Sequence, residues 1–247
     1  MIGEQKMSKL LIALLITVFS VTPVLFGEDL PDYYTQLRDA LFNQDLTSQD
    51  ISGLYTTAEQ QANSSLTGID LNVMLSRCEN IMARALLYEQ KKDAADPYLV
   101  KGLDYAQKSL DQQPTSEGWR MLAENLSQLC TIRSYAWVMK NGLNVEKYCK
   151  NALALDAGNT GAQYMIAARY VYAPAPFRNF NKGIKMMQDI LNNFDSRLMK
   201  DDRFNVVSSI GYALVQQKKN ADAKPWLQKA LNVYPDNKFI GKIFASL

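Results

Sequence analysis

Apolar residues recur at intervals of three and four along most of the chain after residue 28, and short polar stretches separate the runs. This spacing gathers apolar side chains on one face of an α-helix, because a helix has about 3.6 residues per turn. The pattern therefore predicts an all-α protein. Predicted helices span residues 31–43, 48–62, 68–90, 116–139, 181–193 and 237–246, and further helices begin at Pro97, after Gly142 and at Thr160.

The stretch 204–237 is predicted to form one helical hairpin. Three small residues fall where two helices can approach closely, namely Gly211, Ala223 and Ala230. The polar run 218–220 predicts the turn, and Asn220 is expected to cap the second helix. Pro225 lies early in that helix, where few backbone donors are needed, so it is compatible with the prediction.

This hairpin resembles a tetratricopeptide repeat, a unit of about 34 residues built from two helices. The matching positions are Val207, Ile210, Gly211, Leu214, Ala223, Leu227, Ala230 and Pro235. Aliphatic residues replace the family's first bulky position and its two aromatic positions. The resemblance implies antiparallel helical hairpins stacked as a short right-handed solenoid. Four such hairpins would occupy residues 67–247, preceded by a helical cap in residues 28–66.

The three upstream hairpins are less regular than the last one. The run from Gln107 to Pro114 mirrors the run from Gln228 to Pro235, which indicates an internal repeat. The predicted helices 68–90 and 116–139 exceed the length of the first helix in a standard repeat, and the turn 173–180 contains an insertion. We expect the features specific to this protein to lie in these extended parts.

Residues 1–27 have the pattern of a secretory signal peptide. Lys6 and Lys9 precede an apolar run at 10–19, and cleavage is expected near Gly27. The alternative is an uncleaved anchor, although about 20 apolar residues are needed to span a bilayer. No cysteine for lipid attachment follows the apolar run. The prediction is a periplasmic or secreted protein with no membrane span after cleavage.

Composition excludes some partners and leaves one question about cysteine open. The chain carries 27 basic and 25 acidic residues, and its net charge of +2 gives no electrostatic case for nucleic acid binding. Cys78, Cys130 and Cys149 lie among apolar residues at helical spacing, which favours buried thiols. The alternative is a disulfide between Cys130 and Cys149 across the predicted turn at 141–142.

The residue inventory argues against an enzyme. The chain has no histidine, which removes Ser-His-Asp and Cys-His catalysis and the commonest metal ligand. No glycine-rich phosphate loop is present. Asp93, Asp96 and the pair 201–202 are expected in turns as solvated caps. We therefore expect a non-catalytic protein with no cofactor and no metal.

The resemblance to tetratricopeptide repeats implies a partner-binding surface on the first helix of each hairpin. The groove-facing positions would be Arg120, Glu124, Met165, Arg169, Tyr172, Asn205, Ser208, Tyr212 and Gln216. They do not match the Lys and Asn pattern with which some members bind a C-terminal carboxylate, so that ligand is not predicted. The expanded turn adds Phe177, Arg178 and Phe180 as candidate contacts. The alternative for both Phe rings is that they fold back onto the neighbouring hairpin.

Two functions fit these expectations. The first is an exported scaffold that binds a protein or peptide partner through its concave surface. The second is a periplasmic accessory protein of a transport system, with a small-molecule or lipid cavity between its long helices. Such a cavity would be lined by Met74, Met82, Leu126 and Met165.

Overall fold

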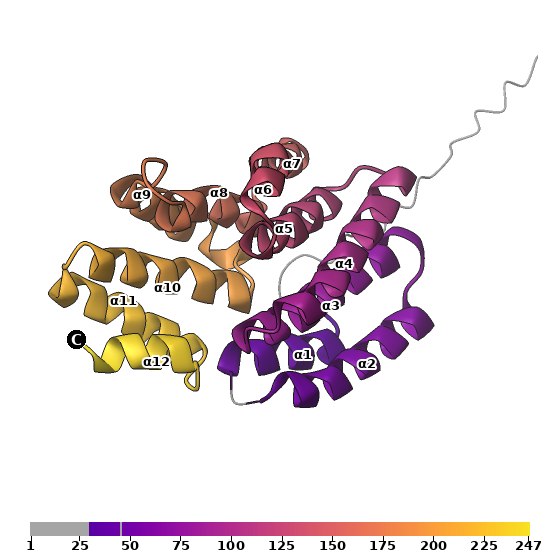
Figure 1. Ribbon diagram of the computed structural model, residues 1–247, viewed down its shortest axis with the longest axis horizontal. Coiled ribbons are helices and arrows are strands. Elements are labelled where there is room, and N and C mark those ends of the chain that lie inside the picture. Colours follow the sequence, from indigo (N-terminus) through magenta and orange to yellow (C-terminus); the bar gives the residue numbers. More distant parts are fainter. Residues whose placement is uncertain (1–29, 45) are drawn as a thin grey trace, which may run out of the picture.

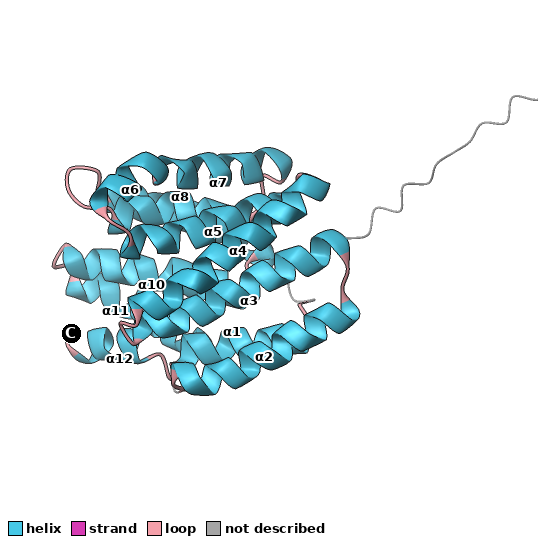
Figure 2. Cartoon of the chain, turned by 45° about the vertical axis from the view of Figure 1, so that its right-hand side comes forward, coloured by secondary structure: helices cyan, strands magenta, loops and turns pink. Residues whose placement is uncertain are grey.

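The computed structural model describes residues 30–44 and 46–247 of the chain, and all regular structure in these ranges is helical (Figure 1, Figure 2). The all-α prediction is thus confirmed, while the expected signal peptide lies outside the described residues. None of the described helices combines the length and the apolar character needed to cross a membrane. The helices are α1 (Asp32–Asn43), α2 (Ser48–Ser65), α3 (Gly68–Tyr88), α4 (Lys92–Gln112), α5 (Ser116–Ile132), α6 (Tyr135–Asn141), α7 (Leu143–Leu155), α8 (Thr160–Tyr172), α9 (Phe180–Phe194), α10 (Lys200–Gln216), α11 (Asn220–Val233) and α12 (Lys238–Ala245), with a 3₁₀ turn η2 at Asp195–Arg197.

Helices that are close in sequence pack as pairs. The contacting pairs are α1 with α2, α3 with α4, α5 with α7, α8 with α9, and α10 with α11. Each pair also contacts the next one, through α2 and α3, α4 and α5, α7 and α8, and α9 and α10. Apolar residues spaced for one helix face are therefore buried between successive pairs, as the periodicity requires.

The last hairpin packs as its small residues predict. Ala223 and Ala230 are fully buried, and a Cβ added to Gly211 would lie 2.7 Å from Cδ2 of Leu227. The glycine thus allows α10 and α11 to approach closely. The expectation for Asn220 is wrong, because this residue is the first of α11 and Lys219 before it makes no side-chain cap.

Two hairpins share one turn geometry. Gln90 after α3 and Lys218 after α10 both adopt positive φ, of 62° and 61°. In each turn the next residue donates its N–H back into the preceding helix, from Lys91 to the carbonyl of Leu86 and from Lys219 to that of Leu214. These are the left-handed closures that end many helices.

The same two hairpins also place a proline alike. Pro97 in α4 and Pro225 in α11 are each the sixth residue of their helix, and the separation along the sequence equals that of the two turns. The prediction that Pro97 starts its helix is therefore wrong, because α4 begins at Lys92, directly after the turn. α4 has 21 residues and α11 has 14, a difference of about two helical turns, which keeps the same face inward.

The predicted helix 116–139 is two helices. α5 ends at Ile132, Arg133 is extended, and the Ser134 hydroxyl accepts a hydrogen bond from the N–H of Trp137 to start α6. The Arg133 guanidinium meanwhile pairs with Asp96 on α4 at 2.7 Å. A serine side chain can hydrogen-bond to nearby backbone groups and therefore favours the N-cap position. Ser134 thus separates two helices, although the apolar spacing continues across it.

The first helix packs against the last hairpin. Phe42 stacks on Tyr234 with ring centroids 5.1 Å apart, and Phe204 meets both rings edge-on. The Tyr234 hydroxyl donates to Asp39 at 2.9 Å, and the Asn237 amide donates to the carbonyl of Phe42 at 2.6 Å. Residues near the two ends of the described chain are therefore held together, and a cleft lies beside this junction.

Candidate functional site

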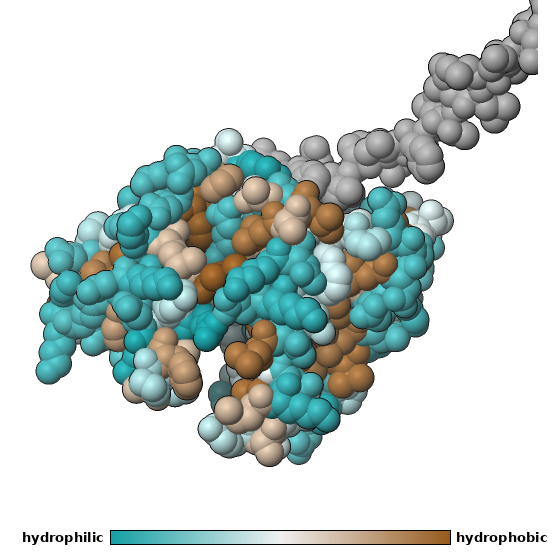
Figure 3. Space-filling view, turned by 90° about the horizontal axis from the view of Figure 1, so that it is seen from above, coloured by the Kyte–Doolittle hydropathy of each residue, from teal (hydrophilic) through white to brown (hydrophobic). Residues whose placement is uncertain are grey.

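A cleft of about 760 Å³ lies where the first and last hairpins meet. One side comes from the end of α1, the start of α2 and the end of α3, and the other from α8, α10 and α12. The molecular surface is visibly hollowed on the face drawn in Figure 3. The polar and aromatic side chains in its lining include Arg84, Tyr88, Tyr172, Asn205, Tyr212 and Phe239.

Aromatic rings form one wall of the cleft. Tyr172 and Tyr212 stack with centroids 5.4 Å apart, and Phe239 lies 6.4 Å from Tyr212. The hydroxyls of Tyr172 and Tyr164 share the Ser209 hydroxyl, at 2.9 and 3.1 Å. These hydrogen bonds hold the tyrosines in place while Tyr172 remains 52% exposed. A fixed, accessible aromatic surface binds a partner at low entropic cost.

A positive group lies opposite, at the end of α3. The Arg84 guanidinium lies 4.8 Å from the centroid of the Phe42 ring, and its Nη2 is 3.4 Å from the Tyr88 hydroxyl. Within residues 30–44 and 46–247, no carboxylate forms an ion pair with it. Lys238 and Lys242 on α12 add two exposed cations to the lining.

Four of the sequence-predicted groove positions meet in this cleft. They are Tyr172 from α8 and Asn205, Ser208 and Tyr212 from α10. These residues come from the first helices of two successive hairpins. The structure thus brings together four of the seven groove positions predicted in the last two hairpins.

Arg120 and Glu124 are not on this surface. Arg120 is 4% exposed, and its guanidinium contacts Glu124 at 2.7 Å and Asp202 of α10 at 2.9 Å. It lies against Gly161 of α8, where an added Cβ would collide with the guanidinium. The expectation that Arg120 faces an open groove is therefore wrong, because three helices enclose it.

The remaining helix positions lie elsewhere. Arg169 is exposed and pairs with Glu146 of α7, outside the cleft. Met165 is half-buried, with its sulfur 4.0 Å from the Cys149 thiol. Gln216 is exposed at the end of α10 and is not among the residues that line the cleft.

The candidate residues of the expanded turn, at 173–180, have different surroundings. Phe177 is 62% exposed, so it is open to a partner. Phe180 instead packs against the core as the first residue of α9, and Arg178 lies 4.9 Å from its ring centroid. Phe180 is thus turned toward the core, whereas Phe177 does not fold back as the alternative expects.

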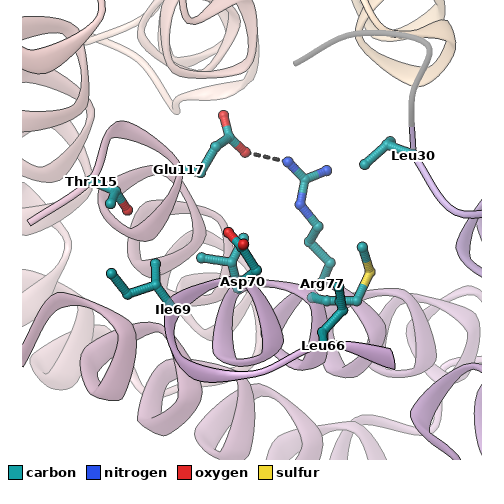
Figure 4. Close-up of a pocket in the computed structure, with 9 residues that line it drawn as sticks. Leu30, Leu66, Ile69, Asp70, Arg77, Thr115 and Glu117 are labelled. Carbon is teal, nitrogen blue, oxygen red and sulfur yellow. Dashed lines mark hydrogen bonds and ion pairs between the residues drawn. The ribbon is translucent and has the colours of Figure 1, made fainter. Parts of the chain in front are cut away.

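A second pocket is much smaller. It has a volume of about 40 Å³ and lies between α3, the start of α5 and Leu30 (Figure 4). This volume is enough for water but far below the roughly 300 Å³ at which small-ligand sites begin. Its polar feature is the buried ion pair between Arg77 and Glu117, drawn as a dashed line in Figure 4.

That ion pair belongs to a buried polar network across four helices. Glu117 of α5 also accepts a hydrogen bond from the Asn159 amide at 2.8 Å, just before α8. Burial disfavours the charge on Glu117, but the Arg77 and Arg120 guanidinium groups outweigh it and lower its pKa. Glu117 therefore stays ionised inside the protein.

The acidic pair at the start of α10 belongs to the same network. Asp202 is 1% exposed, pairs with Arg120 and accepts the Thr160 hydroxyl at 2.8 Å. Asp201 lies 3.6 Å from Arg38 of α1. The expectation of solvated turn residues is wrong for this pair. Both carboxylates are on the inward face of the helix.

The structure also shows where the three cysteines lie, and where the residues expected to line a cavity lie. All three cysteines are free thiols, and burial raises the pKa of Cys78 and of Cys149 to about 12. The disulfide alternative is therefore not what the structure shows. Met82 and Leu126 are buried in packed core, while Met74 borders the 40 Å³ pocket. Of the four residues named for a cavity, only Met74 borders the cleft or the smaller pocket.

Comparisons with known proteins do not assign the chain. A scan against protein-family models gives no match, and a search of curated proteins finds no significant relative. Among the described residues, no group of three or more Cys, Asp and Glu side chains is arranged to hold a metal ion. The case for function therefore depends on the cleft.

Sequence reasoning missed the other side of the cleft. Arg84, Tyr88 and Phe239 come from α3 and α12, and the predicted groove positions include no residue of these two helices. The available signal was Arg84 itself, a charge set between Ala83 and Ala85 in an otherwise apolar part of the helix. Its place in the cleft depends on α10 and α12, which lie more than a hundred residues further along the chain.

The Asp202 carboxyl should make stability depend on pH. Burial raises its pKa to about 7, against the attraction of Arg120, while the ordinary value is about 3.9. Between about pH 4 and 7 the native state keeps a proton that the unfolded chain has lost, so stability falls as pH rises. The expected slope is at most about 1.4 kcal/mol per pH unit.

Urea unfolding of the wild type and of Asp202→Asn at pH 5 to 7 measures this slope. We expect the wild type to lose stability across this range and the variant to change less, because it cannot titrate there. The absence of histidine keeps the window free of other ordinary titrations. Asp195→Asn, which removes an exposed carboxylate, is the control and should keep the wild-type slope. Equal slopes in the wild type and Asp202→Asn would contradict the assignment.

Proposed function

We propose that this chain is a non-catalytic, exported scaffold that binds a protein or peptide partner in the 760 Å³ cleft. The observation that carries the proposal is the convergence of Tyr172, Asn205, Ser208 and Tyr212 on that cleft. The resemblance to tetratricopeptide repeats predicts all four as groove-facing. Tyrosine is enriched in the centres of protein interfaces, where its ring is desolvated.

A resemblance to tetratricopeptide arrays supports the scaffold part of the proposal. The close approach at Gly211 and the shared turn geometry of the α3/α4 and α10/α11 hairpins are features of a repeated helical unit. Export rests on the signal-like pattern of residues 1–27, and places the partner in the periplasm or outside the cell. The accessory-protein alternative has less support, because none of its four expected cavity residues lines the cleft.

Cleft tyrosines should control partner capture. We expect Tyr172→Ala combined with Tyr212→Ala to weaken binding about tenfold or more, since aromatic anchors carry much of an interface's binding energy. A photo-crosslinking residue at Asn205, a half-buried residue of the cleft lining, would trap the partner, and the trapped yield with and without the tyrosines measures the effect.

The matched control is Phe177→Ala combined with Tyr135→Ala. Phe177 and Tyr135 are also exposed aromatics, at 62% and 78%, but lie outside the cleft. We expect this pair of changes to leave capture unchanged. Loss of binding in the control alone would move the partner surface to the loop. A small molecule seen by native mass spectrometry, with no protein trapped, would favour the accessory role.

A further inference from the structure

The cleft holds more positive charge than its own carboxylates neutralise. Arg84, Lys238 and Lys242 line it, and none of them forms an ion pair with the residues that the structure describes. Glu89 is the acidic residue in the lining. Its oxygens already accept the N–H and hydroxyl of Ser48, at 2.5 and 2.7 Å, and pair with Lys91 at 2.6 Å.

Arg84 differs from the other enclosed arginines. Arg38, Arg77 and Arg120 each have a carboxylate partner on a neighbouring helix. Arg84 has an aromatic ring and a tyrosine hydroxyl instead, although it is half-buried at the edge of the same core. A partly desolvated guanidinium is stabilised most by a carboxylate, which it can bind through two parallel hydrogen bonds.

We propose that the occupant of the cleft is an acidic segment of a partner protein, with one carboxylate paired to Arg84 and an aromatic or aliphatic side chain against Tyr172 and Tyr212. This inference rests on the function proposed above and names the chemistry of the partner. A second acidic residue of the segment pairs with Lys238 or Lys242.

The arrangement of charge favours a peptide segment over a small acid. The cations come from two separate elements, α3 and α12, and the aromatic wall from α8, α10 and α12. A ligand that uses all of them carries several groups along its length, as an extended chain does. A volume of about 760 Å³ is in the size range of small-ligand sites, so the cleft holds a few side chains of such a segment and not its whole length.

The test is a peptide array probed with the full chain. It contains random decapeptides in three sets, one with Asp or Glu beside aromatic or large aliphatic residues, one with Asn or Gln at the same places, and one with Lys or Arg there. We expect the wild type to bind the acidic set preferentially. Anisotropy titration of the best acidic peptide then gives the affinity, which should weaken as salt is raised.

Substitution of Arg84 tests whether this residue causes the preference for acidic peptides. We expect Arg84→Gln to bind the best acidic peptide about tenfold or more weakly, as a lost charge-assisted hydrogen bond predicts. The variant should bind the Asn or Gln counterpart as the wild type does, because the aromatic wall is intact. Arg84→Lys should retain part of the preference. Lys140→Gln removes one positive charge from α6, outside the cleft, and should change nothing.

Circular dichroism and thermal melting keep the result interpretable, since Arg84 also lies over Phe42. If Arg84→Gln unfolds, Lys238→Gln combined with Lys242→Gln replaces it as the test, because both side chains are exposed. Preference for neutral or basic peptides, or an acidic preference that survives both variants, overturns this inference and leaves the proposed function standing. Binding to no peptide set overturns both.

Discussion

Replacing Arg120 with methionine is expected to lower the free energy of unfolding by about 3–5 kcal/mol, the usual cost of removing one partner from a buried ion pair. The guanidinium is 4% exposed and faces Glu117, Glu124 and Asp202. Methionine is unbranched, apolar and somewhat shorter than arginine, so Glu124 and Asp202 lose their cation. Glu117 keeps its pair with Arg77. Urea denaturation at pH 8, where Asp202 is mostly ionised, measures the loss.

Two further variants isolate the charge effect. Arg203→Met removes an arginine that pairs with Asp195 in an exposed position, and its cost should stay below about 1 kcal/mol. Combining Arg120→Met with Asp202→Leu removes both members of the buried pair and should recover part of the loss, because no carboxylate of α10 is then stranded. A single Arg120→Met that costs no more than Arg203→Met would show that the network carries little stability.

The helices themselves could be predicted because their signals are local. The apolar spacing in 68–90 and the small residues of the last hairpin depend on neighbours a few positions away. Local signals also compete, which explains where prediction fails. Ser134 ends a helix that the apolar spacing would continue, and the turn closure at Gln90 starts α4 before Pro97.

The cleft could be predicted only in part. The resemblance to tetratricopeptide repeats implies that Tyr172, Asn205 and Tyr212 face one side of their hairpins, so part of the site follows from the repeat pattern. The same resemblance implies that Arg120 faces outward, yet α8 and α10 cover it, and no spacing in α5 shows this. Arg84 and Phe239 join the site because the first and last hairpins meet, and that contact depends on the whole chain.

Tyr234 provides the strongest test of that contact. Its ring is fully buried, stacked on Phe42 and edge-on to Phe204, so Tyr234→Ala leaves a large cavity between the first helix and the last hairpin. We expect a loss of about 3–5 kcal/mol in urea denaturation, as for other buried aromatic residues replaced by alanine. Tyr135→Ala removes a ring that is 78% exposed and should cost less than about 0.5 kcal/mol.

The hydroxyl and the ring of Tyr234 can be separated. Tyr234→Phe keeps the ring and loses the bond to Asp39, which still has Arg38 and Lys200, so about 1 kcal/mol is expected. Amide hydrogen exchange shows which helices lose protection. Tyr234→Ala should speed exchange in α1 more than in α7, which lies away from the junction. Since the cleft borders this junction, the alanine variant should also bind the acidic peptide more weakly than the phenylalanine variant. Equal exchange in α1 for wild type and Tyr234→Ala would mean that the two ends are held together by other contacts, with Asn237 and Phe42 the next pair to change.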